Sequence, residues 1–359
     1  MNLLWSENKK NNIEVPCIEP PTKGAFTQAR NKLKHSLVKK MLRRNIKEFD
    51  EYFGYNYLWK GLRVFAIDGT KYTLPASKEL IEEFGCHKCG ELASHYSQAL
   101  VSVLFNVKSK VAYDVVVEKN YGSERASLKK LCKSLNKNDL VILDRGYPSY
   151  EIIDFLLNKT IYFIMRSCTV STFKFIDDFK ISEEKDKIVE IKIKNKSYKI
   201  RLIKTEDKEP KIFITSLLNK RFYTYIDICN LYRDRWEIEE HYKANKELFK
   251  IENFHSKNKN GIMQEILTQL LFSNITRLVM SQAEKENKNR KDEPSFKNAV
   301  FIVENYFIEI ALCKDTNKTK ELYENMLKDI RRVRYKKRDN RHFPRKSFMV
   351  VTKWSKRKA

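Results

Sequence analysis

The segment Val64-Phe-Ala-Ile-Asp-Gly-Thr70 decides the fold class of this chain. Four consecutive apolar residues lead into Asp68 and a glycine, which is typical of a strand that ends at a turn. The segment Leu140-Val-Ile-Leu-Asp-Arg-Gly146 repeats the pattern and places Asp144 in the same position. Side chains at such strand ends leave the sheet edge and enter a crevice. We therefore predict an α/β domain with two aspartates at strand ends.

Further strands and helices surround these two segments. Residues 98–107 and 110–117 are predicted strands, and two hairpin-like connections join them to each other and to the strand that starts at Val64; 161–164 is another strand. Helical patterns cover 123–135 and 149–157. The predicted order of three strands, helix, strand, helix and strand is typical of α/β layers.

Residues 167–217 interrupt this order with a β-rich stretch. Apolar and polar residues alternate with period two over 191–194 and 198–202, on either side of a turn, and 211–215 predicts one more strand. A helical pattern then covers 225–251. These features predict an antiparallel β insertion within the α/β domain.

The helix that follows the insertion carries the strongest functional signal. A strand-end aspartate alone is more often a turn former than a metal ligand. On an ideal helix, however, four side chains fall within one arc of about 60° beside an apolar stripe, namely Tyr232, Arg235, Glu239 and Lys246. A carboxylate between an arginine and a lysine suits a site that holds both metal ions and phosphate.

This spacing of Tyr, Arg, Glu and Lys resembles the signature of the DDE transposases of insertion sequences in the family numbered four. Ile67-Asp-Gly-Thr70 is similar to that family's first aspartate motif, and Leu143-Asp-Arg-Gly-Tyr147 is similar to its second. The β-rich stretch also lies between the second aspartate and the glutamate, as it does in that family. The resemblance covers roughly residues 26–346.

The resemblance implies a ribonuclease H-like mixed sheet flanked by helices, with Asp68, Asp144 and Glu239 as catalytic and metal-binding acids. Mg2+ suits hard oxygen ligands of this kind, and we expect Mn2+ to be accepted as well. In a two-metal site, one ion activates the attacking water or 3'-hydroxyl and the other stabilises the leaving oxygen. The expected activity is cleavage at the ends of a mobile element and strand transfer to target DNA.

The same resemblance implies roles in DNA binding for the neighbouring residues. Tyr232, Arg235 and Lys246 are expected to hold phosphates near the end of the element. Trp236 either supports a base turned out of the stack or packs in the core. The implied partners are double-stranded DNA, as inverted-repeat ends and as target, and a second copy of the chain in a synaptic homodimer.

The charge of the chain independently indicates a polyanionic partner. There are 71 Lys and Arg residues against 46 Asp and Glu, which gives a net charge of +25. Residues 331–359 contain 13 basic residues and one acid, Asp339, so about half of the net charge lies there. Aromatic residues are interleaved with these charges, which favours nucleic-acid contact over a solubilising tail.

Three segments are expected along the chain. Residues 1–60 form a helical DNA-binding or packing segment, with an amphipathic helix over 26–46. Residues 61–285 form the catalytic domain, which includes the insertion at about 167–217. Residues 286–359 form two C-terminal helices and the basic tail, after a polar linker over 284–295.

The sequence argues against a membrane or zinc protein. Its start lacks the apolar core of a signal peptide, and no run approaches the length of a membrane span. We therefore expect a cytoplasmic, nucleoid-associated protein with no membrane partner. The Cys86-His-Lys-Cys89 segment has no second ligand pair at a distance suitable for zinc.

Two other functions fit the same residues. A transposase-derived DNA-binding protein would keep the fold and the charge without turnover, but the three acids are intact. A ribonuclease H-fold nuclease or resolvase would cut without joining, but the signature helix and the insertion favour transposition. Inverted repeats flanking the coding sequence would decide between them.

Deleting residues 336–359 should weaken the salt dependence of DNA binding. Each phosphate neutralised by Lys or Arg adds about 0.9 to the slope of log K against log salt, so the slope should flatten by several units. Binding titrations over a range of salt concentrations measure this, and an unchanged slope would mean that the tail only solubilises the protein.

Overall fold

The computed structural model describes residues 21–89, 92–167, 173–206, 210–285 and 292–336. Backbone contacts divide the chain into two compact units. One comprises Gly54–Glu252, and the other combines Met1–Phe53 with Asn253–Ala359. The predicted functional division at residues 60 and 285 stays a prediction.

The unit Gly54–Glu252 is built on one nine-stranded sheet. Its strands are β1 (Val64–Leu74), β2 (Cys86–Cys89), β3 (Leu92–Asn106), β4 (Val111–Lys119), β5 (Leu140–Leu143), β6 (Tyr162–Arg166), β7 (Asp186–Ile193), β8 (Lys196–Lys204) and β9 (Ile212–Thr215). Its helices are α4 (Lys78–Phe84), α5 (Glu124–Leu131), α6 (Tyr150–Asn158), α7 (Lys174–Ile181), α8 (Tyr225–Arg233) and α9 (Glu237–Glu247).

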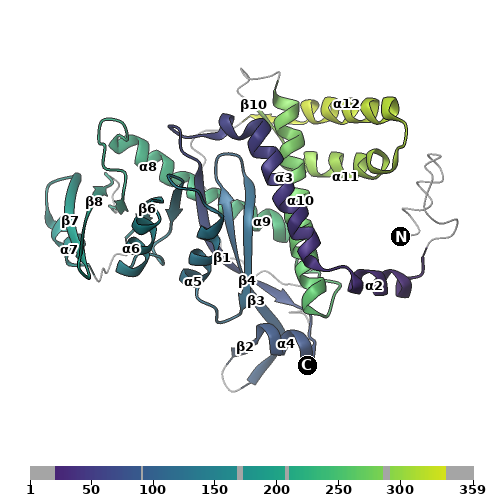
Figure 1. The fold of residues 1–359 in the computed structure, drawn as a ribbon, viewed down its shortest axis with the longest axis horizontal. Coiled ribbons are helices and arrows are strands. Elements are labelled where there is room, and N and C mark those ends of the chain that lie inside the picture. Colours follow the sequence, from purple (N-terminus) through teal and green to yellow (C-terminus); the bar gives the residue numbers. More distant parts are fainter. Residues whose placement is uncertain (1–20, 90–91, 168–172, 207–209, 286–291, 337–359) are drawn as a thin grey trace. The chain divides into compact units, whose positions relative to one another are not determined.

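The strand order confirms the predicted fold class. The sheet runs β2-β3-β1-β5-β6-β9-β8-β7, and β4 also pairs with β3 (Figure 1). β1, β5 and β6 are mutually parallel, whereas β3 runs antiparallel to both of its neighbours β1 and β4. This is a mixed sheet of the ribonuclease H-like type. The predicted hairpin-like connection between the first two strands is wrong, because α4 and β2 lie between β1 and β3 along the chain.

The first strand is longer than predicted. β1 continues through Asp68 to Leu74 because its antiparallel pairing with β3 extends from Phe65 to Leu74. The prediction that the strand ends at Asp68 is therefore wrong. Its parallel pairing with β5 is shorter and ends at Ala66, two residues before Asp68.

The β-rich insertion extends the sheet at the β6 edge. β9 pairs antiparallel with β6, β8 with β9, and β7 with β8. The antiparallel character is as predicted, and the stretch also contains the helix α7.

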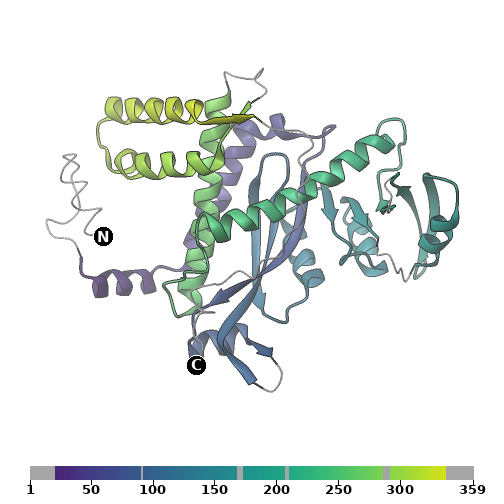
Figure 2. The same ribbon diagram turned by 180° about the vertical axis from the view of Figure 1, so that it is seen from behind.

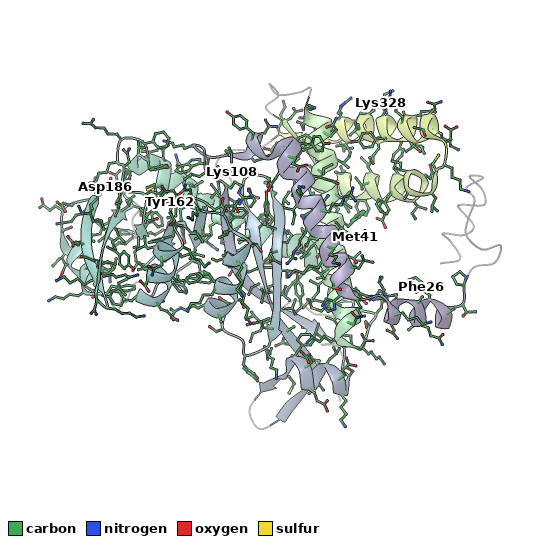
Figure 3. The ribbon with its side chains drawn as sticks, in the orientation of Figure 1. Phe26, Met41, Lys108, Tyr162, Asp186 and Lys328 are labelled. Atoms are coloured by element: carbon green, nitrogen blue, oxygen red, sulfur yellow. The ribbon has the colours of Figure 1, made fainter. Side chains whose placement is uncertain are left out.

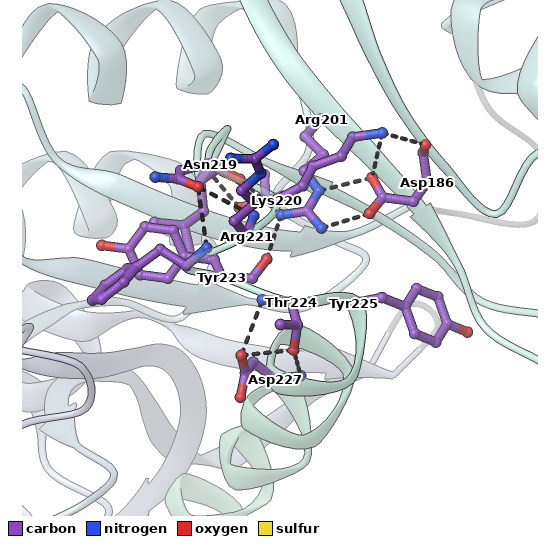
Figure 4. Close-up of polar contacts among 12 residues, drawn as sticks. Asp186, Arg201, Asn219, Lys220, Arg221, Tyr223, Thr224, Tyr225 and Asp227 are labelled. Carbon is purple, nitrogen blue, oxygen red and sulfur yellow. Dashed lines mark hydrogen bonds and ion pairs between the residues drawn. The ribbon is translucent and has the colours of Figure 1, made fainter.

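A buried arginine ties this insertion to the chain that enters α8. Arg201 on β8 is 0% exposed, and its guanidinium donates to both carboxylate oxygens of Asp186, at 2.8 and 2.5 Å (Figure 4). It also donates to the carbonyl oxygens of Leu217 and Tyr223. Exposed Lys220 binds the same aspartate from outside. The hairpin β7-β8 is thereby linked to the segment before α8.

The predicted helix over 225–251 is interrupted. A capping box of Thr224 and Asp227 starts α8, and a 3-10 turn over Asp234–Trp236 separates α8 from α9. The helix ends at Glu247. Figure 2 shows this pair of helices crossing one side of the sheet.

The other unit is mainly helical. Its elements are α2 (Lys23–Lys32), α3 (His35–Phe53), α10 (Lys259–Glu284), α11 (Phe296–Leu312) and α12 (Thr316–Arg332), with a two-stranded sheet of β10 (Asp292–Pro294) and β11 (Arg334–Lys336). α3 lies along α10 (Figure 1). α11 and α12 pack with the end of α10 around the buried residues Val279, Ala299 and Leu327.

The single predicted helix over 26–46 is wrong, because the chain breaks between α2 and α3. Side chains of α10 bind the backbone groups that the break leaves free. Gln264 donates to the Arg30 and Leu33 carbonyls. Asn260 donates to the Leu33 carbonyl and accepts from the His35 amide. Phe26 and Met41 remain exposed (Figure 3).

The C-terminal predictions are only partly within the described residues. The two helices predicted after the linker are α11 and α12. Part of the predicted linker forms β10 instead. Most of the basic tail, from 337 to 359, lies outside the described residues. Within the described part of the chain, none of the helices is long and apolar enough to cross a membrane.

Replacing Arg201 with leucine should destabilise the protein by about 3–5 kcal/mol, because it leaves a partly buried carboxylate and two carbonyls without their donor. The matched control Lys220→Ala removes an exposed partner of the same aspartate and should cost less than about 1 kcal/mol. Denaturant unfolding of both variants measures the difference. Equal costs would show that the buried position of Arg201 is unimportant.

The cost of Arg201→Leu should also depend on pH. Burial acts to raise the pKa of Asp186, but the hydrogen bonds and charge of Arg201 outweigh it and hold that pKa below its usual value. The pairing therefore stabilises the fold fully above the ordinary aspartate pKa of about 3.9 and is lost as pH falls through the lowered value. The difference in unfolding free energy should shrink only in acid.

Candidate active site

The strand register places the two predicted aspartates side by side. In the parallel pair of β1 and β5, Ala66 lies opposite Ile142. Asp68 on β1 and Asp144, directly after the end of β5, each follow two residues later, so they stand at about the same height. Each carboxylate accepts a hydrogen bond from a glycine amide just after it: Gly69 at 2.9 Å for Asp68, and Gly146 at 2.8 Å for Asp144.

The surroundings of Asp68 disfavour its charge. Burial raises the pKa of this carboxyl to about 7, against the lowering effect of the Gly69 amide. The negative charges of Asp144 and Glu124 raise it further, while Arg235 lowers it. The site therefore gathers more negative charge than its own cations neutralise.

Helix α9 is fixed to β1 at the position of Asp68. The buried Tyr242 hydroxyl accepts from the Val103 amide at 3.1 Å and lies 2.7 Å from the Asp68 carbonyl oxygen. Further along the helix, Lys246 Nζ donates to the Lys71 carbonyl at 2.9 Å. The helix thus follows β1, and its polar face meets the strand that carries Asp68.

The turn between β3 and β4 anchors the start of the same helix. Lys108 Nζ lies 2.6 Å from Asp234 in the 3-10 turn, and Lys110 Nζ lies 2.9 Å from Glu237 at the start of α9. These two ion pairs hold the segment that carries Arg235 and Glu239 against the β3-β4 hairpin, which lies more than a hundred residues earlier in the chain (Lys108 is labelled in Figure 3).

Arg235 and Glu239 form an ion pair in the site. Arg235 Nη2 lies 2.6 Å from Glu239 Oε1, and the arginine side chain is only 15% exposed. Its charge also acts on Asp68. Arg235 therefore interacts electrostatically with both Glu239 and Asp68.

The other signature residues have different environments. Tyr232 is largely buried, and its hydroxyl donates to the Leu143 carbonyl at 3.3 Å, next to Asp144. Lys246 also lies 3.7 Å from Glu252. Trp236 is 39% exposed, and the Arg235 guanidinium lies 5.8 Å from the centre of its ring. This exposure disfavours simple core packing of the indole.

The sequence did not point to Glu124 as part of this site. Glu124 begins α5, and partial burial of its carboxyl raises its pKa, as does the charge of Asp144. The only signal was an acid in a first helical turn, which is common because it favours the helix dipole. The structure brings it to the aspartates through the packing of α5.

The chemistry of these side chains fits a divalent cation. Among the described residues, no three His, Cys, Asp or Glu side chains are already arranged around a single point. The donors are nevertheless hard carboxylate oxygens, which Mg2+ prefers. A cation beside Asp68 would also remove the electrostatic cost that raises its pKa. Asp68 and Asp144 are the residues best placed for it, and Glu239 is held by Arg235.

Comparisons with known proteins relate this chain to transposases. The family model of the transposase DDE domain matches residues 59–275. Among solved structures, the chain is similar to a piggyBac transposase in a synaptic complex with hairpin DNA, at a TM-score of 0.43 and 12% identity. The match covers 80% of this chain and 64% of that one, so this chain spans less than two thirds of its length. A search of curated proteins gave no match.

Replacing Ile238 with alanine should cost about 2–5 kcal/mol of stability, since its side chain is 0% exposed on the packed face of α9. The matched control is Ile226→Ala on α8, where the isoleucine is 65% exposed, and it should cost less than about 0.5 kcal/mol. Lys246→Ala should also leave the fold intact. Thermal unfolding compares the three, and a costlier Ile226 variant would mean that the helices face the other way.

Proposed function

The chain belongs to the transposase DDE domain family, and we propose that it is the transposase of a bacterial insertion sequence. In this proposal it binds the inverted-repeat ends of its element, cleaves them, and joins the freed 3'-hydroxyl to target DNA. The observation that carries the proposal is the register of β1 and β5, which sets Asp68 beside Asp144 against the helix that bears Glu239. The resemblance to the insertion-sequence family numbered four supports the finer assignment.

Asp68, Asp144 and Glu239 would hold Mg2+, or Mn2+ in its place. When bound, the ions supply the activation of the attacking oxygen and the stabilisation of the leaving oxygen in a phosphoryl transfer. The carboxylates of Asp68 and Asp144 are oriented by the hydrogen bonds that they accept from the Gly69 and Gly146 amides. Glu239 is now neutralised by Arg235. When Arg235 binds a DNA phosphate, Glu239 is released as a further carboxylate ligand.

The cationic residues of the signature would position DNA rather than take part in the chemistry. Arg235 presents a planar guanidinium that suits bidentate contact with phosphate. Lys246 lies further along the chain on α9, where it donates to the Lys71 carbonyl. The Tyr232 hydroxyl donates to the Leu143 carbonyl at the end of β5, so only the edge of the tyrosine ring would contact the DNA backbone. Exposed Trp236 is available to stack on a base turned out of the duplex.

The proposed partners follow from the charge. A net charge of +25 favours double-stranded DNA, both as element ends and as target. Pairing of two ends in one complex calls for two copies of the chain, so we propose a homodimer acting in the cytoplasm at the nucleoid.

Each of Asp68→Asn, Asp144→Asn and Glu239→Gln should abolish Mg2+-dependent cleavage of DNA that carries the flanking inverted repeats, while binding to that DNA persists. The substitutions keep side-chain size and remove only the charge. Cleavage and gel-shift assays on the same preparations measure the two properties.

Asp177→Asn is the matched control for these variants, because Asp177 is an exposed acid on α7 that pairs with Lys180. It should cleave at the wild-type rate. A wild-type rate in any of the three site variants would remove that residue from the catalytic set.

A further inference from the structure

Glu124 lies where the two aspartate-bearing segments meet. It is the first residue of α5, which Ser123 caps by accepting from the Ala126 amide. The next residue, Arg125, donates to the carbonyls of Gly146 and Pro148, at 2.9 and 3.4 Å. The start of α5 is therefore tied to the loop that follows Asp144.

Glu124 also reaches the strand that carries the first aspartate. A Cβ atom placed on Gly69 would lie 3.0 Å from Glu124 Oε1 and 3.1 Å from its Cγ. The Glu124 side chain thus crosses the bare backbone of the residue directly after Asp68. This close approach explains glycine at position 69, whose backbone does not have a positive φ.

A buried hydroxyl lies beside the same acids. Tyr147 is 1% exposed, and among the described residues its hydroxyl makes no hydrogen bond of standard geometry, although it lies close enough to the Glu124 carboxyl to act to lower that group's pKa. Burial raises the pKa of Tyr147, and the charges of Glu124, Asp68 and Asp144 raise it further. A buried hydroxyl without a well-formed hydrogen bond costs about 1–3 kcal/mol. A polar ligand such as a hydrated cation, bound beside the three acids, would complete the hydrogen bonding of this hydroxyl.

We propose that Glu124 is a further acid of the cation site and binds a divalent metal ion together with Asp68 and Asp144. This inference rests on the proposed function, because it assumes that the two aspartates hold a metal. Glu124 remains exposed as a residue, so an ion reaches it from solvent. Glu239 is paired with Arg235, whereas Glu124 is the acid that already shares the electrostatic environment of both aspartates.

The test measures Mn2+ binding to the full chain by the loss of the free-ion signal in electron paramagnetic resonance. Glu124→Gln should weaken Mn2+ binding at least about tenfold. The matched control is Glu151→Gln, which removes the same charge from the first turn of α6, where Glu151 is exposed and pairs with Lys129. It should bind Mn2+ like the wild type. Asp68→Asn serves as the reference for loss of the site.

The outcomes separate the two proposals. If Asp68→Asn loses Mn2+ while Glu124→Gln binds it as tightly as Glu151→Gln, Glu124 is not a ligand and the proposed site stands without it. If Asp68→Asn binds Mn2+ like the wild type, the proposed metal site fails and this inference fails with it.

Thermal unfolding distinguishes a ligand from a structural residue. Without metal, Glu124→Gln should melt at or above the wild-type temperature, because it removes one charge from a group of acids. With saturating Mn2+, the wild type should gain more in melting temperature than the variant, since a ligand stabilises the state that binds it. A variant that melts lower without metal but gains as much from Mn2+ would overturn the proposal.

Discussion

The pairing of β1 with β5 is the constraint on which the rest of the site depends. Val64, Phe65 and Ala66 are all 0% exposed, and so are their partners on β5. A slip of one residue would turn every side chain of β1 to the opposite face of the sheet, which would bury Asp68 or move it away from Asp144. The buried apolar run thus sets the relative height of the two acids.

Hydrogen bonds and ion pairs then bring the third element of the site to this register. The Tyr242 hydroxyl is inserted where β1 and β3 pair at Asp68, and the lysines of the β3-β4 turn hold the beginning of α9. In the sequence, the β-rich insertion lies between the strands that carry the aspartates and the helix α9. Arg201 links the β7-β8 hairpin of the insertion to the segment that leads into α8. The position of α9 against the sheet therefore depends on contacts made by residues before the insertion and by residues within it.

The site is electrostatically costly, which is expected of a functional site. Acids that share one crevice repel each other, and burial adds to the penalty at Asp68. Arg235 offsets part of this charge through Glu239 and Asp68. A protein selected only for stability would replace such a group with apolar side chains. The excess negative charge is what makes a cation the best complement to this crevice.

The sequence alone determined the α/β class, the antiparallel insertion and the placing of Asp144, because apolar runs and their periodicity are local properties of the chain. It also carried the Tyr232, Arg235, Glu239 and Lys246 spacing. The tertiary structure decided the rest. Asp68 lies inside a strand because β3 pairs beyond it, α2 and α3 separate because Asn260 and Gln264 bind the broken backbone, and Glu124 joins the aspartates because α5 packs there. Each of these depends on partners far away in sequence, which no local pattern specifies.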